Sequence, residues 1–185
     1  MNKFLVGILV IVSFSCQFDK PQSQELIAKL ETPVVVPLPA TAPKDSTEPY
    51  ELKMKMNELE KDEFELELSM LLFNGAHFVS PNAKRAFKGK FTVHLDDNDK
   101  LVPISELIEN PPSVEEYDPH PFVNGNVNWV REDTKYTLKL KRNAEKYFSV
   151  KGFIQFTIEP RCTLEKIPII IKNIKGKLRV ELFQC

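Results

Sequence analysis

Apolar residues that recur at every second position constrain this chain more than any other feature of its sequence. The pattern begins in Leu52–Met56 and returns in Phe64–Met70, where the intervening residues are mostly charged or polar. Side chains that alternate in this way lie on opposite faces of a β-strand, with one face turned toward a core. The same alternation predicts further strands at Phe91–Leu95, Val127–Arg131, Lys135–Leu140, Phe148–Ile158, Ile167–Ile171 and Lys177–Leu182.

The number and spacing of these strands indicate the fold class. They are short, they are joined by turn sequences such as Lys175-Gly176, and helical periodicity is almost absent. Many short strands with this spacing are typical of two packed antiparallel sheets. We therefore expect residues 50–185 to form an all-β domain, an immunoglobulin-like antiparallel β-sandwich.

Two local patterns within this domain carry their own expectations. The apolar residues of Leu101–Asn110 recur at helical spacing, which predicts a helical turn or two. Gly152 interrupts the long strand at Phe148–Ile158, and a glycine there predicts a bulge or the close approach of another backbone.

Residues 1–15 have the organisation of a secretory signal peptide. Lys3 precedes the apolar run Phe4–Val12, and small residues follow before Cys16. The run is about half of the ~20 residues that span a membrane as a helix, so we expect cleavage rather than an uncleaved anchor. The sequence Ser13-Phe14-Ser15-Cys16 resembles the lipobox of bacterial lipoproteins, although that family usually has an aliphatic residue where Ser13 stands.

The resemblance to lipoproteins implies that Cys16 becomes the first residue and is acylated, for example with palmitate. Two or more acyl chains hold a protein stably on a bilayer. We therefore expect a lipid-anchored protein of the bacterial cell envelope, in the outer rather than the inner membrane, facing the periplasm or the surface. The alternative for Cys16 is an ordinary cysteine, with cleavage further along the chain.

Residues 16–49 are expected to form a tether between the lipid and the domain. The segment contains six prolines and no glycine, which excludes a regular helix or a central strand over most of its length. As polyproline II it would extend to roughly 100 Å. The apolar group Val34–Leu38 leaves open a second interpretation, in which this part docks as an edge strand or binds a partner.

Charge and motifs exclude several classes of function. The chain has 25 Lys+Arg and 26 Asp+Glu, a balance that does not predict nucleic-acid binding. Motifs for a phosphate loop, a G-x-S-x-G nucleophile or an H-E-x-x-H zinc site are absent, and the 3 histidines are far apart in the sequence. The run Asp96–Asp99 fits a turn better than a calcium loop, because Leu101 and Leu107 stand where such a loop has glycine and glutamate.

We accordingly expect no catalytic residue, no metal and no cofactor, and a non-enzymatic protein. A hydrolase built from scattered residues remains an alternative. Trp129 is expected to serve a core or a corner of the sandwich rather than to stack on a sugar.

The stretch from Pro111 to Gly125 is the candidate surface for a partner. It reads as a long, acidic, proline-rich loop, and long loops in compact domains are often functional. A solvated connection between strands is the alternative. The residues proposed to contact a protein partner are Glu115, Glu116, Tyr117, Asp118, His120 and Phe122.

With Cys16 acylated, Cys162 and Cys185 remain as a pair in an oxidising compartment. Such pairs commonly form structural disulfides, and we expect one here. A catalytic dithiol usually has its cysteines much closer in sequence, but a redox role and two free thiols are both alternatives.

Two segments, GAHFVSP at Gly75–Pro81 and VKGFIQFTIEPRCTLEKIP at Val150–Pro168, resemble the N-terminal periplasmic domain of DsbD-type thiol–disulfide reductases. The resemblance implies an immunoglobulin-like sandwich with a hairpin whose two cysteines exchange a disulfide with partners. Cys162 matches the second of these cysteines, whereas Phe156–Glu159 occupy the region of the first. The resemblance therefore implies the fold without the dithiol chemistry.

Taken as a sequence, the chain predicts a lipoprotein whose sandwich binds another component of the cell envelope. Two rival functions stay open. One is thiol–disulfide exchange through Cys162. The other is transport of a small ligand, which needs an apolar cavity between the sheets.

Overall fold

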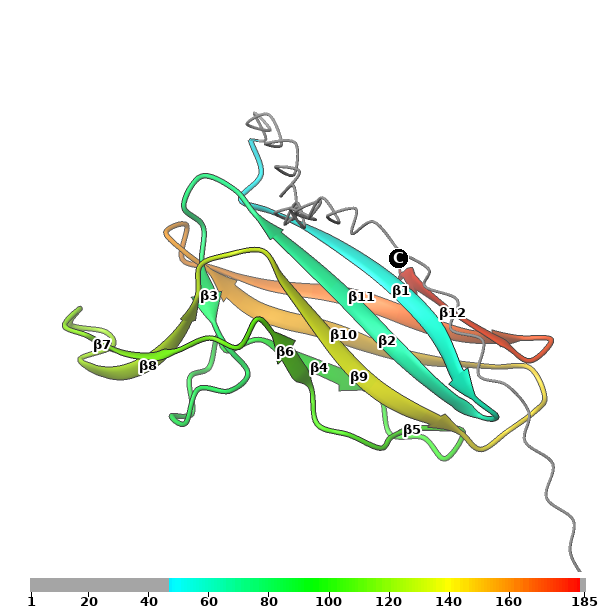
Figure 1. The fold of residues 1–185 in the computed structure, drawn as a ribbon. Coiled ribbons are helices and arrows are strands. Elements are labelled where there is room, and N and C mark those ends of the chain that lie inside the picture. Colours follow the sequence, from blue (N-terminus) through cyan, green and yellow to red (C-terminus); the bar gives the residue numbers. More distant parts are fainter. Residues whose placement is uncertain (1–46, 184–185) are drawn as a thin grey trace, which may run out of the picture. The chain divides into compact units, whose positions relative to one another are not determined.

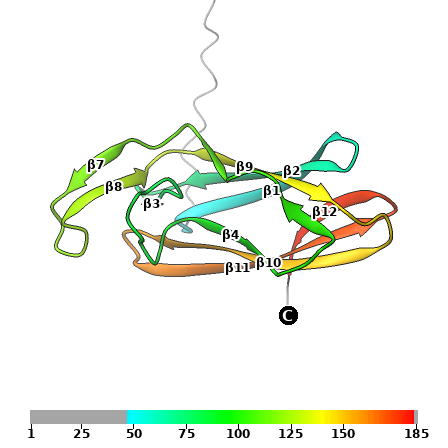
Figure 2. The same cartoon turned by 90° about the horizontal axis from the view of Figure 1, so that it is seen from below.

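The computed structural model describes residues 47–183, and β-strands make up more than half of this range (Figure 1). Two antiparallel sheets lie face to face as separate layers (Figure 2), and a smaller sheet lies at one end. Within the described range no helix is long and apolar enough to cross a membrane. The expected antiparallel β-sandwich is confirmed.

The first sheet has five strands. In spatial order they are β1 (Tyr50–Glu60), β2 (Glu63–Leu72), β9 (Thr134–Arg142) and β5 (Leu101–Pro103), and β6 (Ile108–Asn110) also pairs with β9. Phe64, Leu66 and Leu68 alternate with glutamates along β2 and are buried, while the glutamates face outward. The alternation in the sequence thus sets which side of β2 faces the core.

The second sheet has four strands. In spatial order they are β12 (Lys177–Leu182), β11 (Thr163–Ile174), β10 (Phe148–Ile158) and β4 (Thr92–Leu95). Gly152 of β10 lies against β4, and a Cβ added there would stand 2.2 Å from the carbonyl oxygen of His94. The close backbone approach predicted at Gly152 is confirmed, and it lets β4 pair with β10.

Aromatic rings fill the space between the two large sheets. Phe91 stacks on Tyr136 with ring centroids 4.2 Å apart and lies 5.6 Å from Phe156. Phe78 joins this cluster at 5.5 Å from Phe91. Each of these rings is buried, and burying a large apolar side chain contributes about 1.5–3 kcal/mol to folding.

The third sheet has three strands, β3 (Phe78–Val79), β8 (Gly125–Val130) and β7 (Glu115–Asp118). The predicted loop from Pro111 to Gly125 is therefore wrong in part, because Glu115–Asp118 form a strand. Backbone pairing with Gly125–Asn128 holds this strand, and a pattern of charged residues does not reveal such pairing.

The predicted helical turns within Leu101–Asn110 are also wrong. Leu101 pairs with Arg142 and Ile108 with Thr137, so both ends of the segment are strands on the edge of β9. Between them the backbone N–H of Ile104 donates to Lys139 and the hydroxyl of Ser105 accepts from Lys139. Bonds to a neighbouring strand replace those a helix would make within itself.

Several predicted features lie outside residues 47–183. They are the signal peptide, the acylated Cys16, most of the tether, and Cys185.

Candidate partner-binding hairpin

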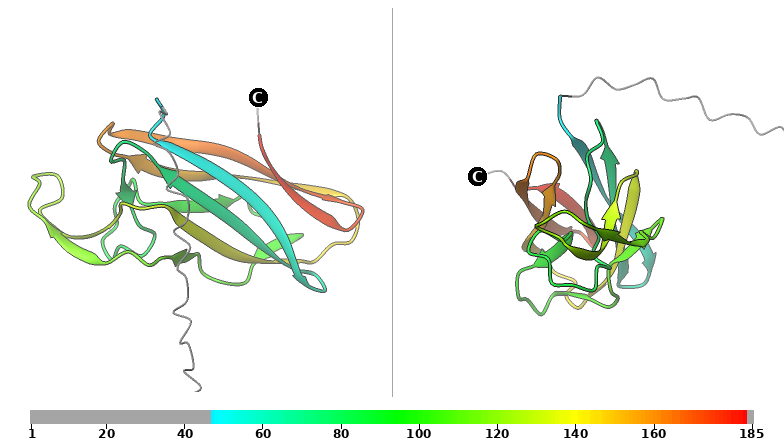
Figure 3. Two further views of the ribbon diagram at one scale, coloured as in Figure 1. Left: turned by 45° about the horizontal axis from the view of Figure 1, so that its top comes forward. Right: turned by 90° about the vertical axis from the view of Figure 1, so that its left-hand side faces the viewer.

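The hairpin formed by β7 and β8 extends beyond one end of the two large sheets (Figures 1 and 3). Glu115 pairs with Asn128 and Asp118 with Gly125, which leaves residues 119–124 as the turn. On its other side β8 pairs with β3, whereas β7 is the last strand of this sheet. Within the part of the chain that the structure describes, one edge of β7 therefore has no neighbouring strand.

Hydrogen bonds fix the turn at the tip of the hairpin. Asp118 Oδ1 accepts the backbone N–H of His120 at 2.8 Å, and the carbonyl of His120 accepts from Val123 and Asn124. The hydroxyl of Tyr117 donates to Asn124 Oδ1 at 3.0 Å across the hairpin. Asn124 has a φ of 36°, in the left-handed region that asparagine tolerates. The turn is thus built from its own polar side chains.

Asp118 also joins the tip of the hairpin to its base. Its Oδ2 accepts the indole N–H of Trp129 at 2.9 Å. The N–H of His120, and after it the indole N–H, stabilise the ionised form and hold the pKa of Asp118 below its ordinary value. The carboxylate therefore acts as a fixed acceptor of hydrogen bonds and not as a proton donor.

Trp129 packs where the hairpin meets the sandwich. The rings of His77 and Trp129 are nearly perpendicular with centroids 4.9 Å apart, and the Arg131 guanidinium lies 5.6 Å from the Trp129 centroid. Val127 is buried beside Val79 and Ala83 in a small cluster of its own. Trp129 is therefore a corner residue at the junction.

The glutamates of β7 are paired with cations. Glu115 Oε2 lies 3.1 Å from Lys84 Nζ, and Glu116 Oε1 lies 2.9 Å from Arg131 Nη2. Surface pairs of this kind contribute little to stability, but they cancel charge locally. The stretch that reads as acidic in the sequence consequently presents much less negative charge than its composition indicates.

Large apolar side chains remain exposed around the hairpin. Phe122 is 92% exposed at the tip, Tyr117 is 64% exposed on β7, and Val114 is 80% exposed just before β7. The ring of His120 lies 5.4 Å from that of Phe122. Of the predicted contact residues, the structure thus brings Tyr117, His120 and Phe122 to the surface of one element.

A buried carboxyl group, that of Glu109, could not be recognised from the sequence. Glu109 of β6 is 6% exposed, and its oxygens accept from Ser80 Oγ at 2.7 Å, Tyr136 Oη at 3.1 Å and the N–H of Ser113 at 2.7 Å. Burial, followed by the charge of Glu109, raises the pKa of Tyr136, which stays a proton donor. The network joins β6 and β9 to the segment that leads into β7.

Cys162 lies in the turn between β10 and β11, with a φ of 50°. Its thiol is exposed and donates to Glu159 Oε2 at 2.9 Å. This hydrogen bond and the negative charge of Glu159 raise the pKa of Cys162. Cys185, the partner of Cys162 in the disulfide expected from the sequence, lies outside the described residues.

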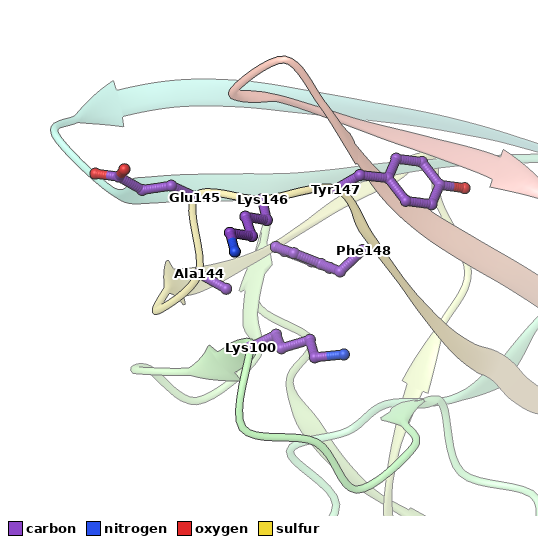
Figure 4. Close-up of a pocket in the computed structure, with 6 residues that line it drawn as sticks. All are labelled: Lys100, Ala144, Glu145, Lys146, Tyr147 and Phe148. Carbon is purple, nitrogen blue, oxygen red and sulfur yellow. The ribbon is translucent and has the colours of Figure 1, made fainter.

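Two pockets among the described residues open on the surface. A hollow of about 560 Å³ is lined by Lys100 and by residues 144–148, and the Glu145 carboxylate points away from the other lining side chains (Figure 4). A second, of about 310 Å³, is lined by residues that include Pro49, Phe73 and Arg161. Residues 47–183 contain no group of three or more His, Cys, Asp or Glu side chains placed to hold a metal ion.

Comparisons with known proteins give structural similarity only. No protein-family model and no curated protein matches the chain. Among solved structures, the reduced N-terminal domain of DsbD from Neisseria meningitidis is 10% identical with a TM-score of 0.43, covering 72% of this chain and 90% of that one. Domains D2 and D3 of the major pilin SpaD from Corynebacterium diphtheriae are 10% identical with a TM-score of 0.34, covering 65% of this chain and 52% of that one. At this level of similarity neither match assigns an activity to the chain.

Proposed function

We propose that this chain is a non-enzymatic lipoprotein of the bacterial cell envelope whose β-sandwich binds a protein partner through the β7–β8 hairpin. The observation that carries the proposal is Phe122, which is 92% exposed on a turn held in place by hydrogen bonds. Exposed aromatic side chains often provide the anchors of protein interfaces. A turn that is already ordered loses less conformational entropy on binding, which favours affinity.

The membrane attachment in this proposal depends on the sequence. The secretory pattern of residues 1–15 and the lipobox-like residues before Cys16 support acylation of that cysteine. The proline-rich segment then links the lipid to the sandwich, which begins at Tyr50. We place the protein in the outer membrane, facing the periplasm or the surface.

Two observations support a binding role over its rivals. Cysteines that exchange disulfides have a lowered pKa, whereas Glu159 raises the pKa of Cys162. A carrier would hold its ligand between the sheets, where Phe91, Tyr136 and Phe156 are packed against one another.

Site-specific photocrosslinking in intact cells tests the hairpin. A photoreactive phenylalanine analogue replaces Phe122 in one strain and Tyr147 in another. Tyr147 is the matched control, because it is an exposed aromatic residue, 70% exposed, in the connection between β9 and β10. We expect a discrete protein adduct from position 122 and none of the same mass from position 147.

A second variant separates the interface from the fold. Phe122→Ala removes the exposed ring and leaves every hydrogen bond of the turn in place, so the thermal unfolding midpoint should stay unchanged. With a crosslinker placed at Tyr117, this substitution should weaken the adduct. The same adduct from both positions, or none from position 122, would contradict the proposal.

A further inference from the structure

The outward side of the second sheet carries an excess of positive charge. Alternate residues of a strand point to opposite sides, and Ile154 of β10 and Ile171 of β11 are buried in the core. Lys151, Phe153 and their register partners therefore point outward from β4, β10, β11 and β12, and we call this surface the basic face. Its basic side chains are Lys151, Lys166, Lys172, Lys177 and Arg179, and its acidic side chains are Glu181 of β12 and Asp96, which follows β4 in register with Lys151.

The outward side of the first sheet has no such excess. Glutamates of β2 lie opposite lysines of β9, as Glu65 does to Lys139 and Glu63 to Lys141. Glu67 lies 3.5 Å from Lys135 in an ion pair. The formal net charge of −1 for the whole chain thus conceals two sheet surfaces of different character.

Most cations of the basic face have no ion-pair partner within residues 47–183. The exception is Lys172, whose Nζ lies 2.6 Å from Glu181 Oε2. Lys151 and Lys166 instead place their ammonium groups 4.6 Å and 3.9 Å from the centroids of the Phe183 and Phe153 rings. Asp96, the residue after β4, lies opposite Lys151, and its backbone N–H donates to the carbonyl of Lys151.

A row of ring-bearing side chains crosses the basic face between these lysines, and three of its four members are apolar. In register across the four strands stand His94, Phe153, Pro168 and Phe183. His94 stacks on Phe153 with centroids 4.7 Å apart, and Lys166 lies near the same ring. The rings of Phe153 and Phe183 each lie near a lysine ammonium group, so charged and apolar side chains are interleaved on this face.

We propose that the basic face lies on the surface of a membrane that contains anionic phospholipids. Lysines attract anionic headgroups, and apolar side chains set between them enter the boundary between headgroups and acyl chains. The proposal goes beyond the function proposed above, because this contact needs neither the acyl group of Cys16 nor the β7–β8 hairpin. It would hold the sandwich flat on the bilayer within the reach of the tether.

Vesicle binding by the mature chain with Cys16→Ser tests the proposal without help from acyl chains. We expect this protein to sediment with vesicles of phosphatidylcholine mixed with phosphatidylglycerol, and not with vesicles of phosphatidylcholine alone. Binding should weaken as salt rises. The double variant Lys151→Glu/Lys166→Glu should reduce the affinity for the anionic vesicles by at least about tenfold.

The first sheet supplies a control that makes the same change in charge. Lys139→Glu/Lys141→Glu reverses two exposed lysines on the other outward surface and should leave vesicle binding within about twofold, since that surface faces away from the bilayer. Circular dichroism and the thermal midpoint show whether each variant is folded.

Three outcomes would overturn the proposal. The first is no preference for the anionic vesicles. The second is an equal loss in both folded double variants, which would mean that only the total charge matters. The third is tighter binding to a soluble anionic polysaccharide, such as polygalacturonate, that depends on Lys151 and Lys166, which would replace the membrane by a glycan.

Discussion

At the scale of single residues, Glu109 shows how one carboxyl group can hold several segments in place. Its oxygens receive hydrogen bonds from Ser80, Tyr136 and the backbone of Ser113, and Asn82 adds a longer one at 3.4 Å. These donors come from segments far apart in the sequence. Without the carboxyl group, they would be left in or near the core without an acceptor.

The first prediction concerns replacement of this residue. Glu109→Ala should lower the free energy of unfolding by about 3 kcal/mol, because the donors lose their acceptor and a small cavity forms. Glu109→Gln should cost about 1 kcal/mol, since its amide oxygen still accepts and the Ser80 and Tyr136 hydroxyls can accept from its NH₂. Urea unfolding measures both values.

Glu116→Ala is the matched control for Glu109→Ala. It removes an exposed glutamate in an ion pair with Arg131, so the free energy of unfolding should change by less than about 0.5 kcal/mol. Equal losses for the two alanine variants would mean that the buried network contributes no more than a surface pair.

The second prediction concerns the reactivity of Cys162 in the reduced chain. Glu159→Gln removes the negative charge that raises the pKa of the thiol, so more of it is thiolate at neutral pH. We expect faster alkylation by iodoacetamide and a rate profile shifted to lower pH. Glu165→Gln is the control, because Glu165 is paired with Arg161, whereas the Cys162 thiol donates to Glu159. An unchanged profile in Glu159→Gln would show that the carboxylate does not govern the thiol.

At the scale of elements, long strands could be predicted from the sequence and short ones could not. In β2 and β10 the alternation of apolar and polar residues extends over ten or more positions, so one register satisfies it. In β6, which has 3 residues, the order is reversed: Ile108 is 53% exposed and Glu109 is buried. The partners of Glu109 come from β9 and from two connecting segments, and no local pattern reveals them.

The candidate hairpin illustrates the same limit. Tyr117, His120 and Phe122 could be singled out because they lie in a long stretch without strong alternation. The pairing of β7 with β8 depends on backbone bonds to residues about ten positions away. The cations that neutralise its glutamates, Lys84 and Arg131, come from other segments.

The third prediction tests the contact between β4 and β10. In Gly152→Ala the new methyl group would stand 2.2 Å from the carbonyl oxygen of His94, so β4 must move away from β10. We expect a loss of about 2 kcal/mol or more in the free energy of unfolding. Amide hydrogen exchange should become faster in Thr92–Leu95 in particular. Ser149→Ala, at an exposed position of the same strand, should change neither quantity by a measurable amount.

The fourth prediction follows from the register of β11 with β12. The N–H of Phe183 donates to the carbonyl of Pro168, which lies six residues, or about 20 Å, from Cys162 along β11. Two further residues extend at most about 7 Å, and a disulfide allows about 7 Å between Cα atoms. A bond from Cys162 to Cys185 therefore requires this end of the sheet to open.

Alkylation of the unreduced chain, followed by intact mass measurement, decides whether that bond forms. If the register holds through Phe183, Cys162 reacts without prior reduction, and this is the result we expect. Protection that is lost on reduction would establish the disulfide expected from the sequence. It would also mean that the hydrogen bond between Phe183 and Pro168 breaks when the disulfide forms.

At the scale of the whole molecule, the distribution of charge matters more than its sum. The near balance of acidic and basic residues indicates no polyanion-binding surface when the sequence is read as a composition. Strand alternation places Lys151 and Lys166 on one sheet surface, while the glutamates of β2 lie opposite lysines on the other. This separation depends on which strands are neighbours, so it emerges only with the fold.

The last prediction joins the proposed lipid anchor to the basic face. A lipid anchor with two or more acyl chains resists salt, because buried hydrocarbon contributes about 0.8 kcal/mol per CH₂ whatever the ionic strength. A contact through lysines is screened as salt rises. In membranes from cells that make this protein, the native chain should therefore stay bound in a high-salt wash. Cys16→Ala should remain in part at low salt and be released at high salt.

Two further variants show which residues account for binding at low salt and which for binding that resists high salt. Cys162→Ala should fractionate like the native chain, because this cysteine is not the proposed site of acylation. Lys151→Glu/Lys166→Glu in the Cys16→Ala background should be soluble even at low salt. If Cys16→Ala stays bound at high salt, another part of the chain anchors this variant, for example an uncleaved apolar run Phe4–Val12, and the basic face is not what holds it. Release of Cys16→Ala at low salt would keep the lipid anchor and remove the basic face as a second contact.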